Sequence, residues 1–303
     1  SLAPRSSFSF AQYGEFLIQQ NRFGEAETIL LKAIECIPVH SNAHLQLAYT
    51  LEKLGQSKKA EKKYRGFIEL EPKNYEGYFK YVRFLQSQNR SVDAEKVIRK
   101  FIKRDSKNAV AYLLLAVHLH DFKQYSEAEV AYRQAIEKGP DNTRNTLAHY
   151  DLGLLLKDQK RYEEAETFFR KAIELDPSYS QAYHNLANLL RSIKQEEDAM
   201  FVLQKALETN PKDFPAQIGI ASLQRILGKN SEAKESAKKS LLLIAKDENY
   251  WYNMACIEAI LENTETAFEN LSNAAKEKDF NKEWAWEDID LQWHPADNLW
   301  PLK

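Results

Sequence analysis

The sequence predicts an all-α protein built from stacked helical hairpins, an α-solenoid. Residues 147–211 contain one pattern of small, large and charged residues written twice, so that Ala165 returns as Ala199 and Pro177 as Pro211, each 34 residues later. A fixed period of this length is typical of a repeat array. The composition agrees, because only 9 Gly in 303 residues and a 44% hydrophobic content suit a helical chain with short connections.

The same register extends over almost the whole chain. Ala recurs eight times at steps of 34 residues, with a single step of 37: Ala26, Ala60, Ala94, Ala128, Ala165, Ala199, Ala233 and Ala267. Twelve residues before each Ala stands a small residue, with Val82 as the exception: Gly14, Ala48, Val82, Ala116, Gly153, Ala187, Ala221 and Ala255. Residues larger than Ala at a close helix crossing would force the helices apart, so the pattern predicts two tightly packed helices per repeat.

These residues resemble the tetratricopeptide repeat, a family with 34 residues and two antiparallel helices per repeat. The resemblance implies a right-handed superhelix of eight repeats, and Pro in five of the repeats would end the second helix. We expect a polar leader at 1–7 and repeats within 8–281. Their approximate boundaries are 7–40, 41–74, 75–108, 109–142, 146–179, 180–213, 214–247 and 248–281.

Two departures from the pattern carry structural expectations. Phe67 and Phe101 stand where the family has Ala, which together with Val82 predicts wider packing in repeats two to four. The polar run at 141–146 predicts a longer loop, since it holds the three extra residues.

Residues 282–303 are expected to cap the last repeat. They contain four of the five Trp, and they loosely resemble the end segments of bacterial and archaeal arrays. A terminal repeat exposes its stacking face unless something covers it. The alternative is that the Trp residues form a recognition motif for another protein or another copy.

No motif for catalysis, phosphate binding or metal ligation is found, so the sequence predicts no enzyme and no cofactor. The two cysteines, Cys36 and Cys256, lie on apolar stripes and are expected to be reduced and structural. No apolar run reaches membrane-spanning length and no signal-peptide pattern is found, so we expect a cytoplasmic protein without membrane contact.

In the resembled family the first helices line a concave groove, and the resemblance implies which positions face it. The middle of this groove would be apolar and would bind an apolar or aromatic protein segment. The Lys-based clamp that some members use for a free C-terminus is absent. The groove residues would be Leu45, Tyr49, Phe79, Arg83, Val110, Leu113, Val117, Leu147, Tyr150, Leu154, His184, Asn185, Asn188 and Tyr252.

The predicted function is therefore a scaffold or adaptor that binds a protein or peptide segment. One alternative is a regulatory or sensor subunit of a larger enzyme system. A weaker one is RNA binding, because residues 41–108 carry 16 Lys/Arg against 8 Asp/Glu. Residues 247–303 carry 4 Lys/Arg against 13 Asp/Glu, so the oppositely charged ends of the chain could also guide self-association. The net charge of −2 gives no general attraction to nucleic acid.

Overall fold

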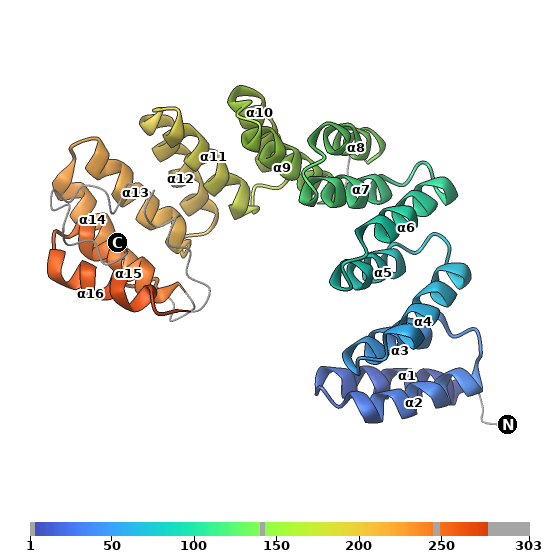
Figure 1. Ribbon diagram of the computed structural model, residues 1–303. Coiled ribbons are helices and arrows are strands. Elements are labelled where there is room, and N and C mark those ends of the chain that lie inside the picture. Colours follow the sequence, from blue (N-terminus) through green and yellow to red (C-terminus); the bar gives the residue numbers. More distant parts are fainter. Residues whose placement is uncertain (1–3, 140–142, 245–248, 278–303) are drawn as a thin grey trace. The chain divides into compact units, whose positions relative to one another are not determined.

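The computed structural model describes residues 4–139, 143–244 and 249–277, and within these residues it contains sixteen α-helices and no strand (Figure 1). The chain divides into two compact units, residues 1–151 and 152–303, with the boundary inside one helix. Each unit is described by itself.

The first unit is a series of antiparallel helix pairs in which each helix from α1 to α8 packs on the next. The first helices α1, α3, α5 and α7 also lie side by side. Its helices are α1 (Pro4–Gln19), α2 (Phe23–Cys36), α3 (Ser41–Lys53), α4 (Ser57–Leu70), α5 (Tyr75–Ser87), α6 (Ser91–Arg104), α7 (Ala109–Asp121), α8 (Tyr125–Lys138) and the start of α9 (Thr143–Asp158).

The second unit repeats this arrangement, with each helix from α10 to α16 packed on the next and with α13 against α15. Its helices, after the end of α9, are α10 (Tyr162–Leu175), α11 (Ser180–Ser192), α12 (Glu196–Thr209), α13 (Phe214–Ile226), α14 (Asn230–Ser240), α15 (Tyr250–Ile260) and α16 (Thr264–Ala274).

All eight hairpins turn in the same way. Each turn contains one residue with left-handed backbone angles, and the amide after it donates to a carbonyl five residues back, as from Gln56 to Leu51 at 2.9 Å. This is the hydrogen bond of a Schellman turn, which satisfies the last carbonyls of the preceding helix. The turn residues recur at the spacing of the Ala series: Asn21, Gly55, Asn89, Lys123, Lys160, Lys194, Gly228 and Glu262.

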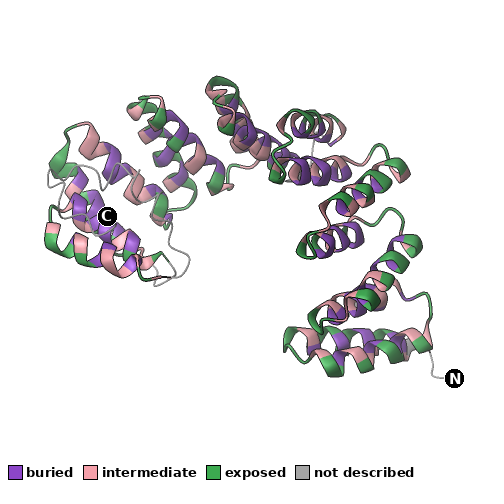
Figure 2. Cartoon of the chain, viewed as in Figure 1, coloured by how far each residue is buried: buried purple, intermediate pink, exposed green. Residues whose placement is uncertain are grey.

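The small residues of the repeat lie where the paired helices meet. All eight Ala of the repeating series are buried, with exposed fractions between 0% and 8%, and buried residues form the seam along each hairpin in Figure 2. A side chain at Gly14 would collide with Leu30, because an added Cβ would lie 2.6 Å from that side chain. The predicted all-α solenoid of helix-turn-helix repeats is confirmed.

The large residues at Phe67 and Phe101 are accommodated by their neighbours. Phe67 is buried on α4, and its ring lies where a side chain at Gly77 would be, 2.1 Å from a Cβ built there. Phe101 stacks on Tyr78 with ring centroids 4.1 Å apart. A glycine on the next first helix therefore makes room for the ring, a compensation that the repeat pattern did not predict.

Two predicted boundaries differ from the structure. Helix α1 starts at Pro4, inside the expected leader, and the Ser7 hydroxyl donates to the Ala33 carbonyl at 2.8 Å, which ties this turn to α2. Helix α9 starts at Thr143, inside the expected loop. The sequence is polar at both places, but the Ser7 hydrogen bond holds the start of α1 on α2, and Asn145 and Thr146 near the start of α9 are buried. The predicted cap at 282–303 lies outside the described residues.

Candidate protein-binding surface

The first helices of the first unit place several of the predicted groove residues on one row. Side-chain hydrogen bonds join neighbouring first helices. Gln46 on α3 donates to Glu15 on α1 at 3.1 Å, and Gln86 on α5 lies 3.1 Å from His118 Nδ1 on α7. We use the name first-helix face for a set of partly or fully exposed side chains on α3, α5, α7 and α9. The set comprises Tyr49, Lys53, Phe79, Lys80, Arg83, Leu113, Val117, Leu147 and Tyr150.

The apolar part of this face comes from α7 and α9. Leu113 and Val117 are one helical turn apart on α7 and both remain partly exposed, as does Tyr150. Leu147 on α9 is 37% exposed. Burial, followed by the charge of Asp151, raises the pKa of Tyr150, so its hydroxyl stays neutral at physiological pH.

The other part of the face, from α3 and α5, combines aromatic rings with cations. The Lys53 ammonium lies 5.2 Å from the centre of the Tyr49 ring, and the Lys80 ammonium lies 5.6 Å from the same ring. The Arg83 guanidinium lies 5.8 Å from the Phe79 ring. We call these five residues the cation–aromatic strip.

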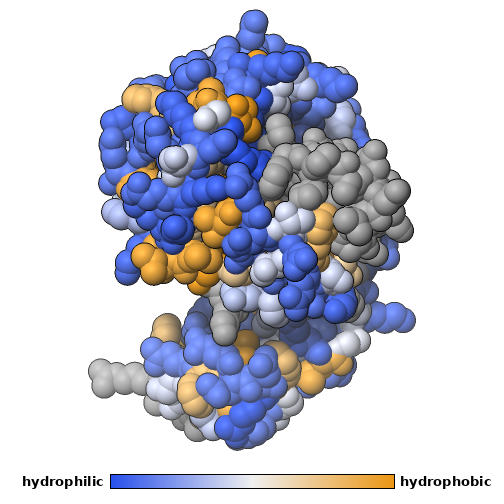
Figure 3. Space-filling model, turned by 90° about the vertical axis from the view of Figure 1, so that its left-hand side faces the viewer, coloured by the Kyte–Doolittle hydropathy of each residue, from blue (hydrophilic) through white to orange (hydrophobic). Residues whose placement is uncertain are grey.

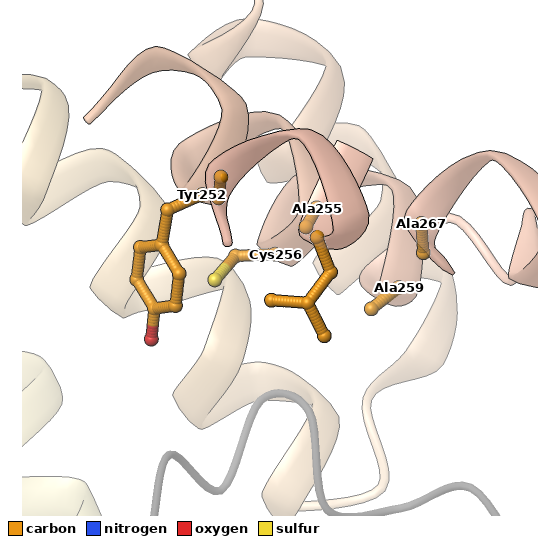
Figure 4. Packing of buried hydrophobic residues seen from close by; sticks show 7 residues of the cluster. Tyr252, Ala255, Cys256, Ala259 and Ala267 are labelled. Atoms are coloured by element: carbon orange, nitrogen blue, oxygen red, sulfur yellow. The ribbon is translucent and has the colours of Figure 1, made fainter. Parts of the chain in front are cut away.

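Three predicted groove residues lie beneath the surface. Leu45, Val110 and Tyr252 are only 3%, 9% and 5% exposed. Figure 4 shows Tyr252 and Cys256 in the core of the α15–α16 pair, together with Ala255, Ala259 and Ala267. Because the hairpins pack tightly there, these side chains can support a binding surface but do not form one.

In the second unit the predicted residues form a polar group. Leu154 and His184 are partly exposed, Asn188 is exposed, and Asn185 accepts a hydrogen bond from the Lys157 ammonium at 3.3 Å. His184 Nε2 lies 2.9 Å from the buried Asp213 carboxylate.

Asp213 is also the N-cap of α13, where it accepts the Ala216 amide at 3.0 Å. Burial alone would raise the pKa of Asp213. The hydrogen bonds from His184 and from the Ala216 amide outweigh burial and hold the pKa below its ordinary value. The Asp213 carboxylate therefore orients the His184 ring.

Sequence reasoning did not single out Lys53 and Lys80. Lys53 lies one helical turn after Tyr49, and this spacing is the signal that could have found it. Lys80 approaches Tyr49 from α5, a contact between helices that the sequence does not show. The face of the molecule in Figure 3 is mostly hydrophilic, with hydrophobic residues in small groups.

Many basic side chains of the second helices α4 and α6 form ion pairs with carboxylates of the same chain. Glu61 on α4 accepts from Arg65 and from Arg90, each at 2.7 Å. Glu69 binds Lys100 at 2.7 Å and Arg104 at 2.5 Å, so these pairs join one repeat to the next. Hydrogen bonds from Arg90 lower the pKa of Glu61.

The described residues contain no cluster of three or more His, Cys, Asp or Glu side chains arranged to hold a metal ion. Neither Cys36 nor Cys256 forms a disulfide bond. In the same part of the chain, no helix has the length and apolar character needed to cross a bilayer.

Three family models, all described as tetratricopeptide repeat, match the chain. One matches residues 146–179, one matches 29–62 and 168–201, and one matches 82–143. With the eight helical hairpins described above, these matches show that the chain belongs to the tetratricopeptide repeat family. Repeats of this family generally mediate protein–protein interaction. No curated protein matches the chain.

Solved structures share the fold. Yeast Tom70 is 20% identical, with a TM-score of 0.60 over 86% of this chain and 54% of its own. The C-terminal part of a repeat protein from Cytophaga hutchinsonii is 19% identical, with a TM-score of 0.57 over 80% of this chain and 99% of its own. A tetratricopeptide repeat protein from Parabacteroides merdae is 15% identical, with a TM-score of 0.52 over 87% of this chain and 99% of its own. At these identities the likeness concerns the fold alone.

Proposed function

We propose that this protein is a non-catalytic scaffold or adaptor that holds a segment of a partner protein on the first-helix face. The tetratricopeptide fold is typically non-catalytic. We further propose that the protein works in the cytoplasm and that it contains the eight repeats expected from the sequence, with the first repeat beginning at α1 and the fifth at α9.

One observation carries this proposal. Leu113, Val117 and Leu147 keep apolar surface exposed on consecutive first helices, whereas other first-helix side chains such as Leu115 and Leu119 are buried. Exposed apolar side chains that gather on one face mark a binding site more often than chance exposure does. The phenol of Tyr150 adds a ring with a polar end, the kind of side chain that is enriched at interfaces.

A matched pair of variants tests the proposal. Leu113→Asp with Tyr150→Asp should abolish capture of the partners that the wild-type chain retains from its native source, while leaving helicity unchanged. Val92→Asp with Val130→Asp adds the same charge on α6 and α8, where both side chains are more than half exposed, and should capture normally. Native affinity in the first variant would show that the face is not the binding site.

The runner-up is a regulatory or sensor subunit of a larger enzyme system, which would use the same face to contact its enzyme. RNA binding by α4 and α6 is the weaker alternative, because Arg65, Arg90, Lys100 and Arg104 already hold carboxylates within the chain. A steep salt dependence of binding to any RNA would favour that alternative.

A further inference from the structure

We infer that the partner segment is acidic and that its carboxylates bind the cation–aromatic strip of α3 and α5. The inference deepens the proposed function, on which it rests, by naming the chemistry of the partner.

The first step is the geometry of the strip. Two ammonium groups, from Lys53 on α3 and Lys80 on α5, approach one ring, that of Tyr49. Arg83 follows on the next turn of α5, against Phe79, whose ring stacks on Tyr75 with centroids 5.5 Å apart. Contact with a ring restricts each long side chain, so less rotamer freedom is lost when the cation binds a ligand.

The second step is the balance of charge on this part of the face. Lys80 pairs with Glu76 at 3.3 Å, and both side chains are more than one-third exposed. Among the described residues, Lys53 and Arg83 have no acidic partner within ion-pair distance. Two other carboxylates on α1 and α3 have partners of their own, since Glu15 accepts a hydrogen bond from Gln46 and Glu52 accepts one from the Tyr64 hydroxyl. Two exposed cations are thus left without a counter-charge.

The third step is the contrast with the second helices of the same repeats. There the arginines Arg65, Arg90, Arg99 and Arg104 each form an ion pair with a glutamate. The same part of the chain therefore neutralises its arginines on one side and leaves Arg83 unpaired on the other. Exposed cations beside partly exposed rings fit a segment in which Asp or Glu alternates with apolar or aromatic residues, and they repel a basic segment.

Peptide selection tests this chemistry without knowledge of the natural partner. A displayed library of random linear twelve-residue peptides is selected against the full chain at 50 mM salt, and the net charge of the enriched peptides is counted. We expect enriched sequences to carry a net charge of −2 or lower. The tightest, synthesised with both ends blocked, should lose at least tenfold in affinity between 50 and 300 mM salt.

Variants show where the acidic peptide binds. Lys53→Glu with Arg83→Glu should lower the affinity for the synthesised peptide at least tenfold. The neutral pair Lys53→Gln with Arg83→Gln should lower this affinity by a smaller factor. Lys62→Glu with Lys103→Glu makes the same charge change on exposed residues of α4 and α6 and should leave affinity within twofold. Circular dichroism checks that each variant is folded.

Failure of this inference differs from failure of the proposed function. If the wild-type chain enriches neutral or basic peptides that Leu113→Asp with Tyr150→Asp abolishes, the face binds protein but the acidic assignment is overturned. Equal weakening by the α4 and α6 control would also overturn it, because general electrostatics would then explain the preference. If no peptide is enriched above a mock selection, both the acidic-segment inference and the proposed protein-binding function fail.

Discussion

The pairs around α4–α6 and those around α14–α16 have the same backbone plan but different cores. The first region buries aromatic rings: Tyr64 packs on Phe84 at 5.4 Å and Phe101 stacks on Tyr78 at 4.1 Å between ring centroids. The last region has a core richer in small residues, such as Ala233, Ala237, Ala255 and Ala259. Its larger buried side chains are Tyr252, Ile257, Ile260 and Leu271. The geometry of a repeat therefore needs only the small residues at the helix crossing, and the rest of the core sets the local stability.

Truncating an aromatic side chain should show this difference most strongly. Phe101→Ala removes a fully buried ring, so we expect a loss of about 3–5 kcal/mol in the free energy of unfolding, measured by urea denaturation. Cys256→Ala, in the small-residue core, should cost about 1 kcal/mol because it removes a single heavy atom. Equal costs would contradict the comparison.

The first unit also contains a partly buried carboxylate, that of Asp151, whose environment differs from that of the ion-paired Glu61. Burial, followed by the charge of Asp121, raises the pKa of Asp151 to about 7. Since the folded pKa lies above the unfolded value of about 3.9, the folded state binds the proton more tightly and stability falls as pH rises from about 4 to 7.

Asp151→Asn should therefore raise the free energy of unfolding at pH 8 by up to about 4 kcal/mol and should change it little below pH 4. Urea denaturation at the two pH values measures this. The lowered pKa of Glu61 acts in the opposite direction, because its contribution is present above its unfolded pKa and is lost as the pH falls. A stabilisation by Asp151→Asn that is the same at both pH values would contradict the assignment.

The feature common to both regions is the small residue at the helix crossing. Ala165 and Ala199 have no exposed surface, so Ala165→Leu and Ala199→Leu should each destabilise by about 1–3 kcal/mol through overpacking. Thermal melting followed by circular dichroism measures the effect. An unchanged melting temperature in both variants would refute the 34-residue register.

The smallest expected effect on stability concerns the C-terminal end of the repeat array. If residues 282–303 cap the last repeat, truncation after Asp279 should lower the melting temperature by about 2–4 °C per kcal/mol lost and should promote aggregation. A truncated chain that keeps its stability and solubility but loses a partner would instead identify the segment as a binding motif.

The sequence predicted the fold well because the same residue types recur at equivalent positions of eight repeats. Any single Ala is weak evidence, but the eight-fold series from Ala26 to Ala267 leaves one register. What it missed depended on contacts between repeats: Gly77 making room for Phe67, and hydrogen bonding that extends α1 to Pro4.

The site was predicted less completely than the fold. Family positions located Tyr49, Phe79 and Leu113 on the partly exposed face, but they could not tell that Leu45 and Val110 are buried. Exposure at one position depends on the sizes of neighbouring side chains from two other helices. Lys80 emerged only when α3 and α5 were placed next to each other, because it approaches the Tyr49 ring from the neighbouring helix.

The most direct test of the binding face is methyl NMR of the chain with labelled Leu and Val, recorded before and after addition of a captured partner segment. The account predicts that the methyl signals of Leu113, Val117 and Leu147 shift, while those of the exposed Val92 and Val130 on the second helices stay in place. Shifts at Val92 and Val130 with none at Leu113, Val117 and Leu147 would contradict it.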